Sequence, residues 1–305
     1  MPAPQQRHHS ATITTFGRLA VAGPRPDAAA KLLSQPKRFA VLIYVLLSQR
    51  GGAVSRDQLI GVFWPESDAS RARNSLRQTL SFVRTCLGQD AVISIGAHGL
   101  AAAPAIACDA VQFDTLLDDG KREEALALYG GELLSGFHIP GSAAFSHWLD
   151  HRREQLAHRA AKAAWDLSAE CEGAGDVRGA AFWGKRALAL SPFSESEVQR
   201  LLRLLDRVGD LTGALRAFTG LEASLRSEFG VQPSAETVRL AAAIRARFEQ
   251  EAAAKPAVPS TRRIARDRRL AQRRIQQMAH AKPDRRTNPD RRTGDRRTGQ
   301  DRRAR

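Results

Sequence analysis

An arginine-rich segment near the N-terminus has the residue types that bind nucleic acid. It reads SRARNSLRQTLSFVRTCLG (residues 70–88) and contains four arginines but no acidic residue. At about 100° per residue of an α-helix, its apolar residues fall on one arc, and the arginines share the adjoining arc with Ser, Asn and Gln. Arginine binds phosphate or donates two hydrogen bonds to guanine, and Asn and Gln pair with adenine. The pattern predicts a DNA-reading helix. The alternative is a solvated polar face that lacks acids by chance.

The segments before this helix are expected to be short strands and helices. Residues 12–22 read as two strands, and residues 29–34 could add a third. A proline then opens an apolar helix over residues 36–48. Ser55, followed three residues later by Gln58, forms a capping box for a second helix.

The arginine-rich segment then reads as the third helix, with Ser70 as its N-cap and Gly88 as its stop. Residues 91–109 read as a hairpin with a loose second strand and a turn at His98. Two helices joined by a short turn and followed by a hairpin are the pattern of a winged helix-turn-helix.

These positions divide the candidate DNA contacts into two groups. Residues near the N-terminal end of the third helix are expected to contact base edges: Arg71, Arg73, Asn74, Arg77 and Gln78. Residues at the starts of the two earlier helices, farther along the third helix and in the hairpin turn are expected to contact phosphate: Lys37, Arg38, Ser55, Arg56, Ser81, Arg84 and His98. The positive dipole end of a helix adds to such phosphate contacts.

The second half of the chain reads as helical, with an internal repeat. AGDVRGAAFWGKRALALSP and VGDLTGALRAFTGLEASL share an opening in which Gly175 and Gly209 are 34 residues apart, the tetratricopeptide period. A partial copy begins near Gly120. Small residues at these positions let paired helices approach closely, and stacked pairs offer a surface to protein partners. Two unrelated helical hairpins are the alternative.

Charge is distributed unevenly along the chain, whose net charge is +15. Residues 252–305 carry 18 Lys and Arg against 5 Asp, and DRRT recurs at Asp284, Asp290 and Asp295 before a final DRRA at Asp301. Residues 1–110 carry 12 basic and 6 acidic residues, whereas residues 111–251 carry 17 and 21. This split indicates a nucleic-acid module, a protein-interaction module and a tail too poor in apolar residues to fold. The tail could clamp polyanions non-specifically; the alternative is a solvated tail with no fixed role.

Other function classes find little support. No apolar run approaches the roughly 20 residues of a membrane span, and no signal-peptide pattern opens the chain. The three separated cysteines, Cys86, Cys108 and Cys171, have neither a disulfide framework nor metal-ligand spacing. We therefore expect a cytoplasmic protein that is nucleoid-associated when bound to DNA.

Catalytic motifs are also missing from the sequence. His147, His151 and His158 fall at helical spacing, and a solvated or packed row is favoured there over a weak metal site. The sequence contains no GxxxxGK[ST] phosphate-binding loop and no nucleophile elbow. We expect a protein that is not an enzyme and uses no cofactor or metal.

The motifs WPESD, ARNSLRQTLSFVR and FGVQPSAET, in this order, resemble those of bacterial antibiotic-pathway regulators (SARP-like proteins). The resemblance covers residues 12–248. It implies an OmpR-type winged helix, a bacterial transcriptional activator domain of tetratricopeptide-like repeats, binding to promoter DNA at direct repeats as a homodimer, and contact with RNA polymerase. The hairpin turn departs from the family because it lacks the usual aromatic and basic pair, with only His98 present.

The expected fold is therefore α+β at the front and all-α behind. We predict a winged-helix domain at residues 11–110, a tetratricopeptide-like activator domain at residues 111–250, and a mostly disordered basic tail at residues 251–305. The expected function is that of a sequence-specific transcriptional regulator acting as an activator. The alternative is an interaction scaffold whose basic tail binds RNA or a membrane.

Overall fold

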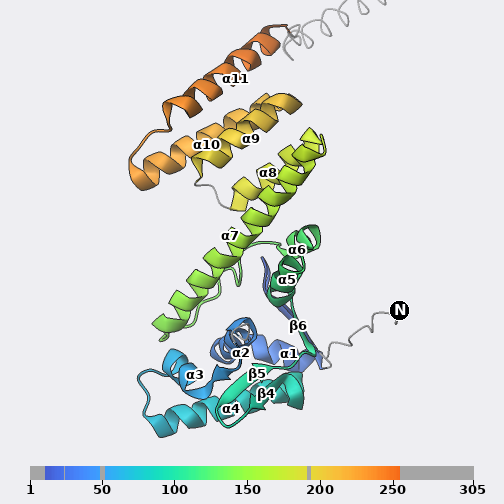
Figure 1. Cartoon of the computed structure of the whole chain (residues 1–305). Helices are drawn as coiled ribbons and strands as arrows, with labels where there is room; N and C mark the ends of the chain where they lie inside the picture. The colour runs from blue at the N-terminus through green and yellow to red at the C-terminus, as the bar shows by residue number, and fades with distance from the viewer. Residues whose placement is uncertain (1–10, 24, 49–51, 191–193, 255–305) are drawn as a thin grey trace, which may run out of the picture. The chain divides into compact units, whose positions relative to one another are not determined.

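The computed structural model describes residues 11–23, 25–48, 52–190 and 194–254 (Figure 1). The described residues up to Glu249 belong to one compact unit. None of the described helices combines the length and hydropathy needed to cross a bilayer. The basic tail beyond residue 254, and with it the predicted polyanion clamp, lies outside the described residues.

A three-stranded sheet contains the chain's first strands. Two strands form near the predicted residues 12–22: β1 (Ala11–Thr14) and β2 (Ala20–Ala22), which pair antiparallel, and β6 (Ile106–Cys108) adds to β1 in parallel. The turn between β1 and β2 requires glycine at position 17. Its φ is 71°, and a Cβ there would lie 2.7 Å from the carbonyl oxygen of Gly130. The helical half of the chain thus packs directly against this turn.

Three helices follow the first two strands: α1 (Pro26–Leu33), α2 (Pro36–Ser48) and α3 (Arg56–Phe63). The expected third strand over residues 29–34 is wrong, because this segment lies in α1. Its proline in the first turn and its buried Ala29 and Leu32, three residues apart, suit a helix better than a strand. Helix α2 contributes an unbroken run of buried side chains from Phe39 to Leu47 and forms the centre of the front core.

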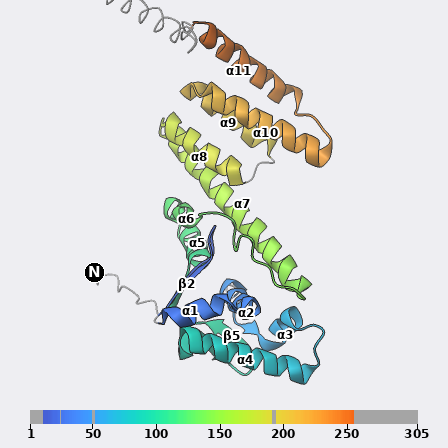
Figure 2. The same cartoon turned by 180° about the vertical axis from the view of Figure 1, so that it is seen from behind.

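The arginine-rich segment forms α4 (Ala69–Leu87), which packs against α1 and α2 (Figure 2). The predicted N-cap Ser70 is wrong. The cap is Asp68, whose carboxylate accepts a hydrogen bond of 2.9 Å from the Arg71 amide. Asp and Ser serve equally well as N-caps, so the sequence alone did not separate two positions only two residues apart.

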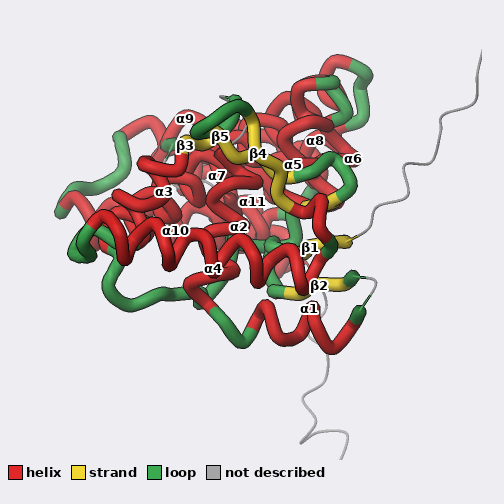
Figure 3. The backbone as a smooth tube through the Cα atoms, turned by 90° about the horizontal axis from the view of Figure 1, so that it is seen from below, coloured by secondary structure: helices red, strands yellow, loops and turns green. Residues whose placement is uncertain are grey.

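The hairpin after α4 forms a second small sheet together with a short strand that precedes α3. Its strands, in the order β3-β5-β4, are β3 (Val54–Ser55), β4 (Val92–Ile95) and β5 (Gly99–Ala102). A 3-10 turn at Gln89–Ala91 connects α4 to β4. The predicted single second strand is divided, since β5 ends at Ala102 and β6 joins the other sheet. Figure 3 shows the strands in these two groups among the helices.

The rest of the unit is helical: α5 (Asp109–Asp118), α6 (Arg122–Leu128), α7 (Ala143–Gly173), α8 (Val177–Leu190), α9 (Glu195–Val208), α10 (Leu211–Phe229) and α11 (Ala235–Ala254). The pairs α7–α8 and α9–α10 are the two predicted repeats. Pro192, the last residue of the first quoted repeat segment, lies outside the described residues.

The shared sequence of the repeats has a physical explanation at the turn inside each pair. Gly175 and Gly209 adopt positive φ values of 79° and 78°, which end the first helix. The aspartate that follows each glycine caps the second helix, accepting a hydrogen bond from the Gly179 amide at 2.9 Å in one copy and the Gly213 amide at 2.8 Å in the other. The repeated Gly-Asp pair therefore ends the first helix of each pair and begins the second.

The front and helical parts share one hydrophobic core. The Asp109 carboxylate, at the start of α5, accepts hydrogen bonds from the amides of Thr15 (2.8 Å) and Phe16 (3.0 Å) after β1. The buried Ser142 hydroxyl, at the start of α7, donates to the Val62 carbonyl at 2.6 Å. The domain boundary predicted between residues 110 and 111 falls inside α5, so the elements on its two sides are packed together rather than joined by a linker.

Candidate nucleic-acid interface

Helix α4 presents its polar residues to solvent and its apolar residues to the core. Ala72, Leu76, Leu80 and Val83 are buried. The residues expected to contact bases are all exposed: Arg71, Arg73, Asn74, Arg77 and Gln78. The division into two faces therefore agrees with the periodicity of the sequence. The base and phosphate roles of these residues stay predictions.

One acid does offset part of the arginine face. The Asp68 carboxylate, which caps α4, lies 3.7 Å from the Arg71 guanidinium at a highly exposed position. Such a pair contributes little energy in water. The side chains of Arg73, Asn74, Arg77 and Gln78 make no hydrogen bond or ion pair with any other described residue.

A recess of about 540 Å³ lies between α3, α4 and the hairpin turn, and we call it the wing recess. Its described lining includes four arginines and one histidine against a single acid: Arg56, Asp57, Ile60, Arg73, Leu76, Arg77, Leu80, Arg84 and His98. Residues from three separate segments thus converge on one concave, strongly basic surface. The base-reading and phosphate-binding candidates meet in this recess.

Hydrogen bonds hold the hairpin against the helices at this recess. The Arg56 amide donates to the His98 carbonyl at 2.9 Å, and the Arg56 guanidinium donates to the Ser94 hydroxyl at 3.0 Å. The Arg84 guanidinium donates twice to the Val92 carbonyl, at 3.0 and 2.8 Å. Arg84 is therefore half-buried and positions β4, a structural role that the sequence did not indicate.

A second recess, of about 270 Å³, lies on the other side of α4, beside the start of α2. We call it the flank recess; its lining includes Lys37, Arg38, Trp64 and Gln78. The Lys37 ammonium lies 5.3 Å from the centre of the Trp64 ring, and burial lowers the pKa of this lysine.

Aromatic rings support the two basic residues at the start of α2. The Arg38 guanidinium stacks 4.3 Å from the centre of the Phe82 ring on α4, much as Lys37 lies over Trp64. These rings hold the cations at the edge of the α4 face. The sequence reasoning missed Trp64 and Phe82, and no local signal could have identified them, because they lie 27 and 44 residues after the cations that they contact.

Two phosphate candidates have positions that narrow their roles. The Ser55 hydroxyl accepts a hydrogen bond of 3.0 Å from the Gln58 amide, as the predicted capping box requires. The reciprocal half is not formed, because the Gln58 side chain donates to the Tyr44 hydroxyl at 2.9 Å. Ser81 is exposed on the same arc of α4 as Arg77.

At the hairpin tip, Ile95 is exposed to 46%, an apolar contact point that the sequence reasoning also missed.

The histidine row on α7 does not assemble a metal site. The His151 ring lies 2.7 Å from the Gln155 amide group, and His158 lies in a surface hollow with the cationic Arg152 and Arg159. In the described parts of the chain, no group of three or more His, Cys, Asp or Glu side chains could hold a metal ion.

Comparison with known proteins agrees with this architecture. Residues 120–245 match the bacterial transcriptional activator domain family. The regulatory protein AfsR of Streptomyces griseus is 27% identical over 257 residues, which are 78% of this chain and 25% of AfsR. The solved structure of Mycobacterium tuberculosis EmbR, in complex with a low-affinity phosphopeptide, superimposes with a TM-score of 0.51 at 18% identity, covering 79% of this chain and 66% of that one.

Each comparison supports a different part of the description. The likeness to EmbR concerns the fold, because identity is low, and it confirms an α/β front followed by a helical domain. The chain spans about a quarter of the length of AfsR. Together with the activator-domain match, these findings confirm the resemblance to SARP-like bacterial transcriptional regulators.

Proposed function

We propose that this SARP-like chain is a transcriptional regulator that binds duplex DNA in a sequence-specific manner through α4 and the hairpin. The observation that carries the proposal is the wing recess, where four arginines from α3 and α4 meet His98 with Asp57 as the sole acid in its described lining. A concave cationic surface beside an exposed, acid-free helix matches a phosphate backbone and a groove.

In the proposed complex, α4 lies in the major groove, which is wide enough for an α-helix. Arg73, Asn74, Arg77 and Gln78 are exposed and unengaged within the described protein, so their hydrogen-bonding groups are free for base edges. Arg71 stands beside them at the N-terminal end of the helix, with its weak pairing to Asp68 easily exchanged.

Phosphate contacts are proposed on both sides of α4. Lys37 and Arg38, in the first turn of α2, contact phosphates of one DNA strand from the flank recess. Arg56 and His98 contact phosphates of the other DNA strand from the wing recess. The partial charge at the N-terminal ends of α2 and α3 adds to the attraction for each phosphate.

A smaller contribution to phosphate binding is proposed for Ser55, Ser81 and Arg84. The Ser55 hydroxyl is occupied as a helix cap, and the Arg84 guanidinium is occupied by the Val92 carbonyl. Each retains further hydrogen-bonding capacity, whereas Ser81 is exposed and can approach the backbone directly.

The helical part is proposed to contact the transcription machinery. The match to the bacterial transcriptional activator domain and the acidic balance of residues 111–251 support activation through RNA polymerase. We further propose that two copies bind side by side on promoter direct repeats, an arrangement that the SARP-like resemblance suggests.

The test is a charge-reversal comparison on the full chain. The double variant Arg73→Glu/Arg77→Glu should lose most of its affinity for duplex DNA. The control Arg239→Glu reverses one charge at an exposed position of α11 and should retain nearly all of the affinity. The two losses are compared after division by the number of reversed charges. An equal loss of affinity per reversed charge in the two variants would mean that binding depends on net charge and the basic tail. The scaffold with a polyanion-binding tail would then be the better account.

A further inference from the structure

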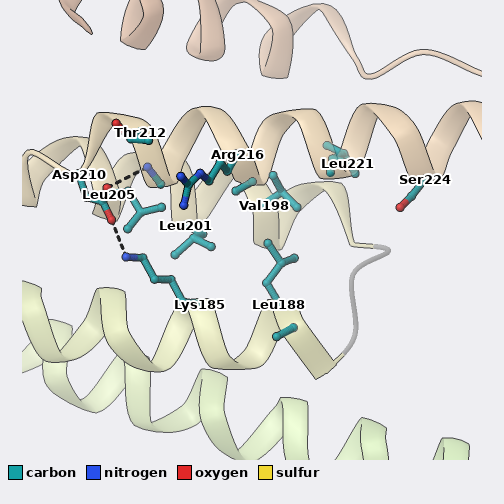
Figure 4. A pocket seen from close by; sticks show the side chains of 14 residues that line it. Lys185, Leu188, Val198, Leu201, Leu205, Asp210, Thr212, Arg216, Leu221 and Ser224 are labelled. Atoms are coloured by element: carbon teal, nitrogen blue, oxygen red, sulfur yellow. Dashed lines mark hydrogen bonds and ion pairs between the residues drawn. The ribbon is translucent and has the colours of Figure 1, made fainter. Parts of the chain in front are cut away.

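A pocket in the helical repeats has the size of a small-molecule site. It lies between α8 and α10, the second helices of the two repeats, and α9 forms its floor (Figure 4). Its volume is about 500 Å³, inside the range of roughly 300–1,000 Å³ that is usual for ligand sites. We call it the repeat pocket. It shares no lining residue with the wing recess or the flank recess.

The wall of the repeat pocket is mainly apolar. Its side chains come from all three helices: Leu188, Val198, Leu201, Leu205, Ala217 and Leu221. A surface of this kind excludes water and favours the apolar body of a ligand through the hydrophobic effect.

One end of the repeat pocket is polar and carries a net positive charge. The Lys185 ammonium lies 2.5 Å from one carboxylate oxygen of Asp210, and the other oxygen accepts a hydrogen bond of 2.8 Å from the Gly213 amide. Asp210 is thus satisfied from within the protein. The pKa of its carboxyl is lowered, first by the hydrogen bond from Lys185 and then by that from Gly213.

Among the described residues, Arg216 has no hydrogen-bond or ion-pair partner at this end of the pocket, although its charge also helps to lower the pKa of the nearby Asp210 carboxyl. It belongs to α10, and in Figure 4 its guanidinium points toward the end that holds Lys185 and Asp210. A guanidinium beside an apolar wall is suited to hold a carboxylate through two parallel hydrogen bonds.

Small residues on α10 keep the repeat pocket open. Ala217, Gly220 and Ser224 line it at helical spacing. A Cβ added at Gly220 would meet no atom within 4 Å, so a larger side chain there would occupy the space of the pocket rather than strain the helix. Glycine is unfavourable in the interior of a helix, and its presence here leaves room that leucine would fill.

We propose that the repeat pocket binds a small amphipathic carboxylate. The apolar body of the ligand lies on the leucine-rich wall, and its carboxylate pairs with Arg216. This site goes beyond the proposed DNA contacts and does not depend on them, since its residues lie on other helices.

Calorimetric titration of the full chain with octanoate and with octanamide tests the proposal. The two probes share an apolar chain and differ in charge. Octanoate should bind saturably at one site and about tenfold more tightly than octanamide, the smaller end of what a charge-assisted hydrogen bond contributes. Arg216→Gln should abolish this preference. Absence of saturable octanoate binding, or an unchanged preference in Arg216→Gln, would overturn the proposal.

A pocket-filling variant separates this site from adventitious binding to the basic tail. Gly220→Leu should remove octanoate binding while its melting temperature stays equal to that of the wild type or rises. Gly173→Leu, at an exposed helical glycine of α7 with open space around its Cβ, is the matched control and should bind octanoate normally. Equal binding by Gly220→Leu and Gly173→Leu would place the octanoate elsewhere and refute the assignment.

Discussion

Replacing Arg77 by alanine tests the proposed reading of DNA bases at the centre of the α4 face. Arg77 is exposed and lines the wing recess, and its side chain makes no hydrogen bond or ion pair with another described residue. Alanine is the best helix former, so Arg77→Ala should leave the stability of the protein unchanged or slightly raised. Any loss of function would therefore arise in the complex with DNA.

The expected loss follows from the contact that Arg77 is proposed to make. A bidentate arginine–guanine pair contributes about 1–3 kcal/mol of discrimination. The ratio of affinities for a specific and a mixed-sequence duplex should therefore fall by roughly five- to 150-fold. Because the guanidinium also carries charge, affinity for the mixed-sequence duplex should fall as well, but by much less.

Competition binding at fixed salt measures this ratio directly. A labelled specific duplex is displaced by unlabelled specific and mixed-sequence duplexes, with wild type, Arg77→Ala and the remote control Arg239→Ala in parallel. Arg239 is also an exposed helical arginine, so its loss should leave the ratio unchanged. If Arg77→Ala weakens binding to all duplexes equally, Arg77 contacts phosphate and the base-reading argument is refuted.

Four further outcomes are expected. Lys37→Gln should weaken binding to all sequences alike and reduce the slope of log affinity against log salt by about one, measured by salt titration. Arg84→Ala removes two hydrogen bonds to β4 and should lower the free energy of unfolding by ~1 kcal/mol in urea, whereas an unchanged value would exclude its positioning role. Ser142→Ala removes a buried helix cap and should cost about 1–2 kcal/mol in the same assay; a neutral result would contradict the proposed link between α3 and α7. The folded-state pKa of Asp210 is lowered, so its stabilising effect is present above the unfolded pKa of about 4 and is lost as the pH falls below it. The stability difference between wild type and Asp210→Asn should accordingly shrink from pH 7 to pH 3, and a constant difference would count against the Lys185 pairing.

Local patterns predicted much of the fold because they depend on neighbouring residues. The two faces of α4 follow from helical periodicity, and the turn within each repeat follows from a glycine–aspartate pair that stops one helix and starts the next. The errors had a local origin as well. Residues 29–34 carry few turn signals of their own, and the helix they belong to starts upstream, at Pro26. The capping residue Asp68 lies two positions before the one predicted.

Long-range pairing could not be predicted from these patterns. Strand β6 leaves the hairpin to pair with β1, about a hundred residues earlier in the chain, and no periodicity encodes such a choice of partner. The same limitation applies to the candidate site. Arg56, Arg77 and His98 were identified one by one from residue type, whereas their convergence on a single recess depends on how three segments pack.

Selection of bound fragments from a genomic DNA library tests the central claim most directly. It should be run with the full chain and with a chain ending at Glu251, which lacks the basic tail. The account predicts that one recurrent sequence motif is recovered with both proteins, with weaker overall retention by the shorter one. Fragments without a shared sequence, recovered only when the tail is present, would contradict sequence recognition by α4 and favour a polyanion-binding scaffold.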